Sequence, residues 1–155
     1  MASIAILRVG SSAVLALVAT AAFADAELDA AQERWESAGL RDYEYGYHKY
    51  CECHRDAPPE TTVTIRDGKV VGVRHRPVGS ATEVPAADKN LGYYWTVDGL
   101  FALIASAQQR GVEVRAQYDS GLGYPREVYI DYDSDFIGDE LDVRLTGVTS
   151  LPNGR

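Results

Sequence analysis

The stretch ETTVTIRDGKVVGVRHR, residues 60–76, decides the fold class because it reads as two strands joined by a tight turn. Apolar and polar residues alternate on both sides of Asp67 and Gly68, which is typical of a β-hairpin. A two-residue turn would put the apolar residues of the two strands on opposite faces. A three-residue loop, residues 66–68 with Gly68 in the left-handed region, pairs Ile65 with Lys69 and gathers them on one face. We therefore predict the three-residue loop, with one apolar face made by Val63, Ile65, Val71 and Val73.

The chain before the hairpin predicts a helix and a strand. Residues 42–53, DYEYGYHKYCEC, alternate with a period of two, so they form a strand. One face of this strand carries Tyr43, Tyr45, Tyr47, Cys51 and Cys53. Residues 25–40 repeat apolar positions every three to four residues, which predicts an amphipathic helix that begins at Asp25 and ends at Gly39.

The chain after the hairpin predicts a loop, a second helix and three strands. Residues 76–92 carry two prolines and two glycines and form a loop. Thr96 is expected to cap a helix over residues 97–110 that Gly111 ends. Its core stripe is Val97, Leu100, Phe101, Ile104 and Ala107. Residues 112–119, 126–133 and 141–148 alternate in polarity and read as three further strands.

This order predicts an α+β fold. Short links between neighbouring strands make them antiparallel, and alternating polarity leaves each sheet face half apolar. We expect one antiparallel sheet of about five or six strands with two helices on one face. A two-sheet or barrel-like closure is the alternative.

The first residues predict a secretory signal peptide. Residues 1–24 contain Arg8, an apolar run and small residues before a cleavage site after Ala24. The alternative, an N-terminal membrane helix, needs roughly 20 apolar residues. We therefore expect residues 25–155 to form one globular domain, periplasmic or secreted, without stable membrane insertion after cleavage.

The charge of the chain excludes some partners. Of the residues, 46% are hydrophobic, so a folded core is expected. The formal net charge of the chain is −8. A negative field repels phosphate backbones and anionic headgroups. Nucleic acid and membrane surfaces are therefore not expected partners.

Several short motifs follow one another along the chain: Tyr-x-Tyr, Cys51-Glu52-Cys53, the Asp-Gly hairpin, Leu100-Phe101 at a helix start, Gly123-Tyr124-Pro125 and Asp139-Glu140. Their order resembles a family of small exported bacterial domains of unknown function, many of which look like lipoproteins. The likeness spans roughly residues 33 to 148. It implies an envelope location and a cysteine pair, and it implies no activity. This chain lacks the lipobox cysteine, so membrane tethering is not implied for it.

The two cysteines of the chain, Cys51 and Cys53, allow three chemistries. In an oxidising compartment, two cysteines that are the only ones in a chain usually form a disulfide. Here the disulfide requires a bend of the chain at Glu52. Thiolate and imidazole also suit copper or zinc, with His48 and His54 as further ligands and the more distant His75 in reserve. A thiol-redox site is the third alternative. We favour the disulfide, because His48 lies on the opposite strand face and the spacing is not that of a zinc site.

Residues 131–142, DYDSDFIGDELD, are strongly acidic. Alternate aspartates resemble a calcium loop, with Asp131, Asp133, Asp135 and Asp139 as candidate ligands. A calcium loop needs glycine at its sixth position, where this chain has Phe136, and flanking helices where strands are expected. We favour a solvated acidic turn.

Four aromatic residues could form a binding surface, although such residues more often pack with the hydroxyl satisfied. They are Tyr93, Tyr94, Trp95 and Tyr124. No catalytic set is recognisable in the sequence, which favours a protein that is not an enzyme. We expect an exported, non-enzymatic module that binds an envelope protein or a small ligand without a cofactor. A metal-handling protein for copper or zinc, or a thiol-redox protein, is the alternative, and calcium is a further possible cofactor.

Overall fold

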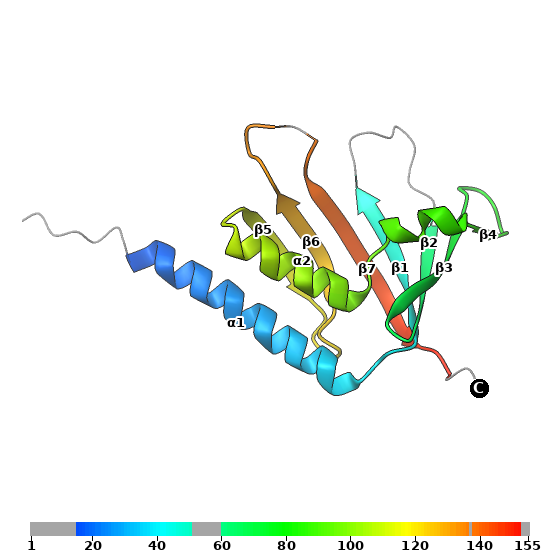
Figure 1. Cartoon of the computed structure of the whole chain (residues 1–155), viewed down its shortest axis with the longest axis horizontal. Coiled ribbons are helices and arrows are strands. Elements are labelled where there is room, and N and C mark those ends of the chain that lie inside the picture. Colours follow the sequence, from blue (N-terminus) through cyan, green and yellow to red (C-terminus); the bar gives the residue numbers. More distant parts are fainter. Residues whose placement is uncertain (1–14, 51–59, 137, 153–155) are drawn as a thin grey trace, which may run out of the picture.

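The computed structural model describes residues 15–50, 60–136 and 138–152, which form one layer of strands covered by helices (Figure 1). Within these ranges the sheet is antiparallel and has seven strands in the order β4-β3-β2-β1-β7-β6-β5. The elements in chain order are α1 (Leu15–Ala38), β1 (Tyr43–Tyr50), β2 (Glu60–Arg66), β3 (Lys69–Arg76), β4 (Val84–Pro85), the 3-10 helix η1 (Asp88–Tyr93), α2 (Val97–Gln109), β5 (Glu113–Tyr118), β6 (Pro125–Asp131) and β7 (Leu141–Ser150).

The predicted count of five or six strands is therefore wrong. The seventh strand, β4, lies inside residues 76–92, which the sequence predicts as a loop. Two residues cannot show a period, and Pro85 argues against a strand because it cannot donate to a ladder. Proline is tolerated here because β4 pairs only with β3, at the edge of the sheet. The described sheet is open, with β4 and β5 as its edges, so the alternative of a two-sheet or barrel-like closure is also wrong.

The β2–β3 hairpin corrects the predicted register. Arg66 pairs with Lys69 and Ile65 with Val70, so the turn has two residues, Asp67 and Gly68. Both adopt positive φ, of 47° and 69°, as a type I′ turn requires. A bulge then shifts the register between Thr64 and Ile65. This bulge returns Val73 to the buried face but leaves Val71 exposed, so the predicted apolar face holds for Val63, Ile65 and Val73 alone.

Helix α1 starts earlier than the sequence predicts. It runs from Leu15, so Asp25 lies within the helix and not at its predicted start. The apolar stripe nevertheless buries Leu28, Ala31 and Trp35 against the sheet. The indole Nε1 of Trp35 donates to Oδ1 of Asp98 at 2.9 Å, which ties α1 to the first turn of α2.

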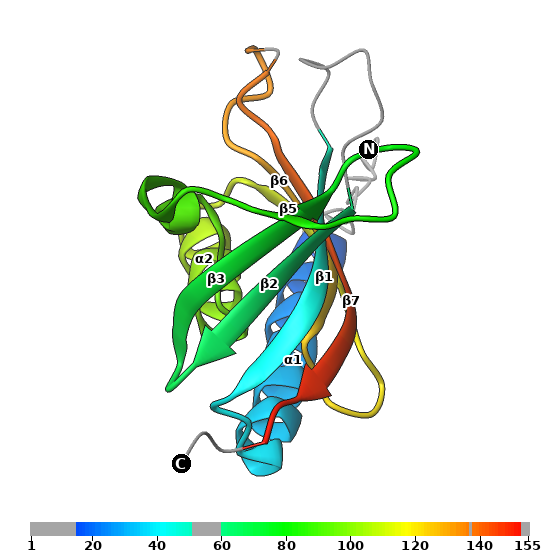
Figure 2. The same ribbon diagram turned by 90° about the vertical axis from the view of Figure 1, so that its right-hand side faces the viewer.

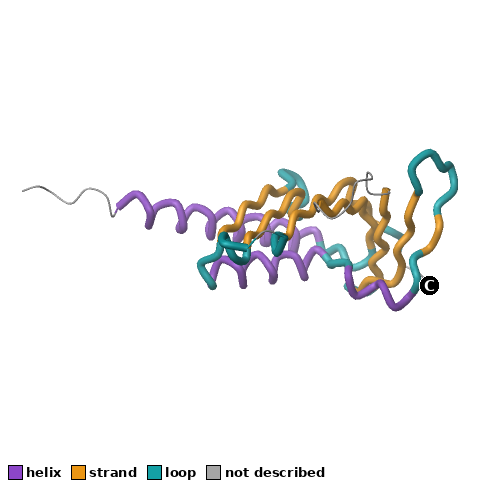
Figure 3. The backbone as a smooth tube through the Cα atoms, turned by 90° about the horizontal axis from the view of Figure 1, so that it is seen from above, coloured by secondary structure: helices purple, strands orange, loops and turns teal. Residues whose placement is uncertain are grey.

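Helix α2 confirms its prediction. The hydroxyl of Thr96 accepts a hydrogen bond from the backbone N–H of Gly99 at 3.0 Å, as an N-cap should. The buried residues of the helix are those of the predicted stripe. Seen from above, α1 and α2 lie along the same face of the strands (Figure 3).

Strand β7 holds the two parts of the sheet together. It pairs with β1 on one side and with β6 on the other, although β1 and β6 are far apart from each other in the chain. Figure 2 shows β3, β2, β1 and β7 in order across the sheet. The strands β1 and β7 therefore occupy its centre, and the inward face of β1 is covered by the helices.

Candidate functional site

The inward face of β1 carries a row of tyrosines. Tyr43, Tyr45 and Tyr47 alternate with more exposed residues, as a strand with one covered face requires, and each is at most 5% exposed. The ring centroids of Tyr43 and Tyr45 lie 6.2 Å apart, and those of Tyr45 and Tyr47 lie 6.5 Å apart. The row continues from Tyr47 to Tyr94, edge to face at 5.2 Å.

The three hydroxyl groups of this row differ in their partners. Tyr43 accepts a hydrogen bond from the backbone N–H of Val97 at 3.0 Å. Tyr45 donates to the backbone carbonyl of Trp95. The hydroxyl oxygen of Tyr47 is buried and has no hydrogen-bond partner among the described residues. Because buried polar groups are nearly always paired, the Tyr47 hydroxyl is an exception that needs an explanation.

A pocket of about 430 Å³ opens beside Tyr47. It lies where the end of β1 and the start of β2 meet the chain that leaves η1. Its lining is mostly aromatic and apolar, with a few polar side chains. The lining residues are Tyr47, Lys49, Thr61, His75, Gly92, Tyr93, Tyr94, Trp95 and Leu141.

The strand register explains why distant residues share this pocket. Tyr47 on β1 pairs with Thr61 on β2, which pairs with His75 on β3. Residues that pair across strands point to the same face of a sheet. The three side chains therefore form one row across the floor of the pocket, and Lys49 joins them because it lies two residues after Tyr47.

The polar groups of β2 and β3 in this row are already engaged. Nδ1 of His75 lies 3.0 Å from the hydroxyl oxygen of Thr61, and Nε2 of His75 lies 3.4 Å from that of Tyr94. The imidazole therefore fixes the ring of Tyr94 against the sheet. Burial raises the pKa of Tyr47 to about 12, so at neutral pH its phenol stays protonated and can donate.

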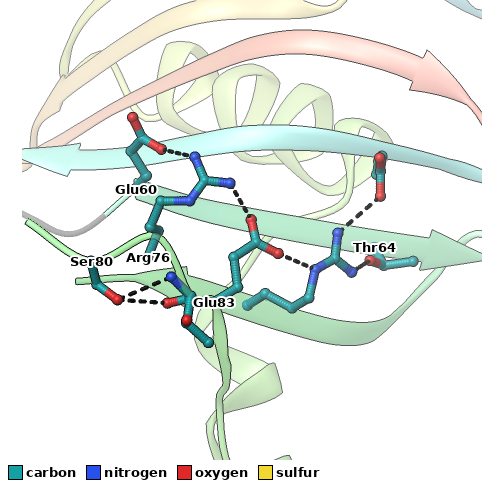
Figure 4. A network of polar contacts seen from close by, with 8 residues as sticks. Glu60, Thr64, Arg76, Ser80 and Glu83 are labelled. Carbon is teal, nitrogen blue, oxygen red and sulfur yellow. Dashed lines mark hydrogen bonds and ion pairs between the residues drawn. The ribbon is translucent and has the colours of Figure 1, made fainter. Parts of the chain in front are cut away.

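An ion-pair network positions the chain between β3 and the pocket (Figure 4). The carboxylate of Glu83 bridges Arg74 at 2.8 Å and Arg76 at 3.0 Å. Arg76 also binds Glu60 at 2.7 Å. Just after this network, the backbone N–H of Ala86 donates to the carbonyl of Val73 at 2.8 Å. The network therefore holds β4 on β3 and directs η1, with Tyr93 at its end, toward the pocket.

The structure brings together three of the four aromatic residues proposed as a binding surface. Tyr93, Tyr94 and Trp95 line the pocket, and Tyr93 is 76% exposed at its mouth. Tyr124 does not line it and is buried. Tyr47 is not among the site residues predicted from the sequence. Its spacing of two from Lys49 indicates that the two residues share a strand face. This spacing does not show whether the Tyr47 hydroxyl has a hydrogen-bond partner.

The predicted cysteine site is only partly described. Cys51, Cys53 and His54 lie outside the described residues. His48 lies on the face of β1 opposite to Tyr47, where its ring stacks on Tyr50 with centroids 5.7 Å apart. The disulfide and the copper or zinc site therefore remain predictions.

The predicted calcium loop connects β6 and β7. The Oδ1 atom of Asp133 accepts from the backbone N–H of Asp135 at 3.1 Å, as in a simple turn. Burial, followed by the nearby charge of Asp131, raises the pKa of Asp139. Within the described ranges, no three His, Cys, Asp or Glu side chains are grouped as metal ligands.

The fold and the pocket define an α+β protein with one open antiparallel sheet and an aromatic pocket at one end of its covered face. The chain belongs to the family of unknown function DUF6174, which it matches over residues 27–150. No curated protein and no solved structure matches the chain. In the part of the chain that the structure describes, neither helix has the length and hydropathy needed to cross a membrane.

Proposed function

We propose that this protein is an exported, non-enzymatic binding module that takes a small ligand in the pocket beside Tyr47. In this proposal the signal peptide, residues 1–24, directs export. A disulfide between Cys51 and Cys53 then gives local shape to the chain between β1 and β2. The pocket volume of about 430 Å³ supports a small ligand, because such sites span roughly 300–1,000 Å³.

The unpaired hydroxyl of Tyr47 carries the proposal. A buried hydroxyl without a partner costs roughly 1–3 kcal/mol, and phenylalanine would fill the same space without this cost. Tyrosine at this position therefore lowers stability in the free protein. A ligand with a hydrogen-bond acceptor would satisfy the hydroxyl and recover the lost free energy on binding.

The lining of the pocket supports the same function. Small-molecule sites are mostly apolar and carry a few well-placed polar groups. Here Tyr94 and Trp95 supply flat apolar walls, and Tyr47 supplies a hydroxyl that no described neighbour binds. The held ring of Tyr94 makes the wall preformed, so little ordering is needed on binding.

Fragment binding to the full chain tests the proposal. A library of several hundred small molecules would be followed by NMR, with the indole signal of Trp95 as the reporter. The indole of Trp35 is the matched control, because it is buried and bonded to Asp98. We expect several fragments to shift the Trp95 signal and leave the Trp35 signal unchanged. A library without any fragment that shifts Trp95 would contradict the proposal.

A further inference from the structure

The chemistry of the ligand follows from the polar groups that the protein leaves unused. In the pocket, His75 is engaged by Thr61 and Tyr94, so this group of side chains needs no ligand. The Tyr47 hydroxyl has no partner, and Lys49 makes no ion pair within the described chain.

Tyr47 and Lys49 can act on one group of a ligand. Residues two apart on a strand point to the same face and are separated by about 6.5–7 Å along it. A flexible lysine side chain spans this distance easily. A neutral phenol O–H and an ammonium are both hydrogen-bond donors. Neither donor has a described acceptor in the protein, and one of them is cationic. Together they favour a ligand that carries an anionic oxygen group.

The remaining lining fits an apolar, planar body. Tyr94 and Trp95 are half-buried, while Tyr93 is exposed at the mouth. Aromatic walls favour flat rings, which they contact by stacking or edge to face. Leu141 adds an aliphatic contact on the side of β7. The apolar part of the ligand would therefore lie between these residues, with its polar end toward β1.

The charge of the whole protein limits the charge of the ligand. The formal net charge is −8, so the long-range field opposes anions, and most strongly those with several charges. A single carboxylate can be held by one local ammonium and one phenol. A phosphate-rich or polyanionic molecule would meet more repulsion than Lys49 offsets.

We propose that the pocket selects a small aromatic monocarboxylate, whose carboxylate accepts hydrogen bonds from the Tyr47 hydroxyl and the Lys49 ammonium while its ring lies against Tyr94 and Trp95. This inference rests on the proposed function, since it names the ligand class of the same pocket. It makes Lys49 and Tyr47 the residues that determine specificity.

Matched pairs of probes test this inference on the full chain. The pairs are 2-naphthoate with 2-naphthamide, and indole-3-acetate with indole-3-acetamide, titrated at pH 7 and followed by the Trp95 NMR signal. We expect each acid to bind about 10-fold more tightly than its amide, because a charged partner strengthens a hydrogen bond. In Lys49→Gln the ratio should fall to about one. Tyr47→Phe should weaken both members of each pair.

Lys69→Gln is the control variant, because Lys69 is exposed at the hairpin turn, at the other end of β2 from the pocket. It should keep the wild-type ratio. Equal binding of acids and amides by the wild type would overturn the inference, and so would an unchanged ratio in Lys49→Gln. If fragments shift Trp95 but acids are not preferred, the inference fails while the proposed function stands. If no molecule shifts Trp95, both fail.

Discussion

Replacing Tyr47 by phenylalanine should stabilise the protein while weakening ligand binding. The hydroxyl of Tyr47 is buried and has no partner in the described part of the chain, so its removal ends a desolvation cost of roughly 1–3 kcal/mol. Tyr47 belongs to the buried core and also lines the pocket, and we take the lower end of this range, about 1 kcal/mol. The ring stays in place and keeps its contact with Tyr94 at 5.2 Å. The free energy of unfolding should therefore rise by about 1 kcal/mol.

The matched control lies four residues earlier on the same face. In Tyr43→Phe the backbone N–H of Val97 loses its acceptor at 3.0 Å. This N–H is the first of helix α2 and has no partner within the helix. The variant should lose about 1–3 kcal/mol. The two substitutions remove the same atom from the same strand, yet they should change stability in opposite directions.

Urea unfolding followed by circular dichroism measures both variants. With a slope of about 2 kcal/mol per molar, Tyr47→Phe should move the midpoint up by about 0.5 M, and Tyr43→Phe should move it down by at least as much. If Tyr47→Phe destabilises the protein as much as Tyr43→Phe, the Tyr47 hydroxyl has a partner in solution. The hydroxyl would then not be available as a donor to a ligand.

Three further predictions concern the rest of the chain. Gly123→Ala should lower the free energy of unfolding by about 3 kcal/mol, because its new Cβ would lie 2.2 Å from a backbone oxygen of α1 and its φ is +85°. The control Gly111→Ala, with φ of +71° and open space around it, should lower it by only about 1 kcal/mol, and equal losses in urea unfolding would contradict the close contact. Burial raises the pKa of Tyr43 to about 12 from 10.0 in the unfolded chain, so the unfolded chain loses this proton first. The free energy of unfolding should be unaffected by this group below pH 10 and fall by about 1.4 kcal/mol per pH unit above it, and a flat profile from pH 10 to 11.5 would disagree. Finally, the chain exported by a bacterium should have the intact mass of residues 25–155 less about 2 Da for the two hydrogens lost in a disulfide, and Cys51 and Cys53 should be unreactive until reduced. Reactive thiols without reductant would exclude the disulfide.

The parts of the fold that the sequence predicts are those with local signals. Helix α2 has a capping hydroxyl at Thr96, a complete apolar stripe and Gly111 after its end, and each signal acts within a few residues. The tyrosines of β1 likewise show their period directly. These features depend on neighbours in the chain, so no knowledge of the tertiary fold is needed.

The parts that failed depend on partners far away in the chain. The alternation of apolar and polar residues does not show that a bulge after Val70 moves Val71 to the surface. A bulge changes which residues pair across the strands, but it does not change the order of residues in the sequence. The same holds for β4, whose two residues form a strand only because β3 is beside them. Strand order is also non-local, and nothing within β7 indicates that it lies between β1 and β6.

The candidate site divides in the same way. Tyr93, Tyr94 and Trp95 are adjacent in the chain, so a sequence shows them as a group. His75 and Tyr47 reach the pocket only through the register of three strands. The unpaired state of the Tyr47 hydroxyl is a property of its surroundings, which only a three-dimensional structure describes.

The central place of β7 determines when this protein can finish folding. The strands β1 to β4 form one group of hairpin-connected neighbours, and β5 with β6 forms another. The two groups are joined in the sheet only by β7, which comes last among the described strands in chain order. Non-local pairing of this kind is slow, because the long loop must close before the contacts form. The sheet therefore stays incomplete until β7 has been synthesised, and in a chain stalled on the ribosome before β7 the two groups of strands would not be hydrogen-bonded to each other.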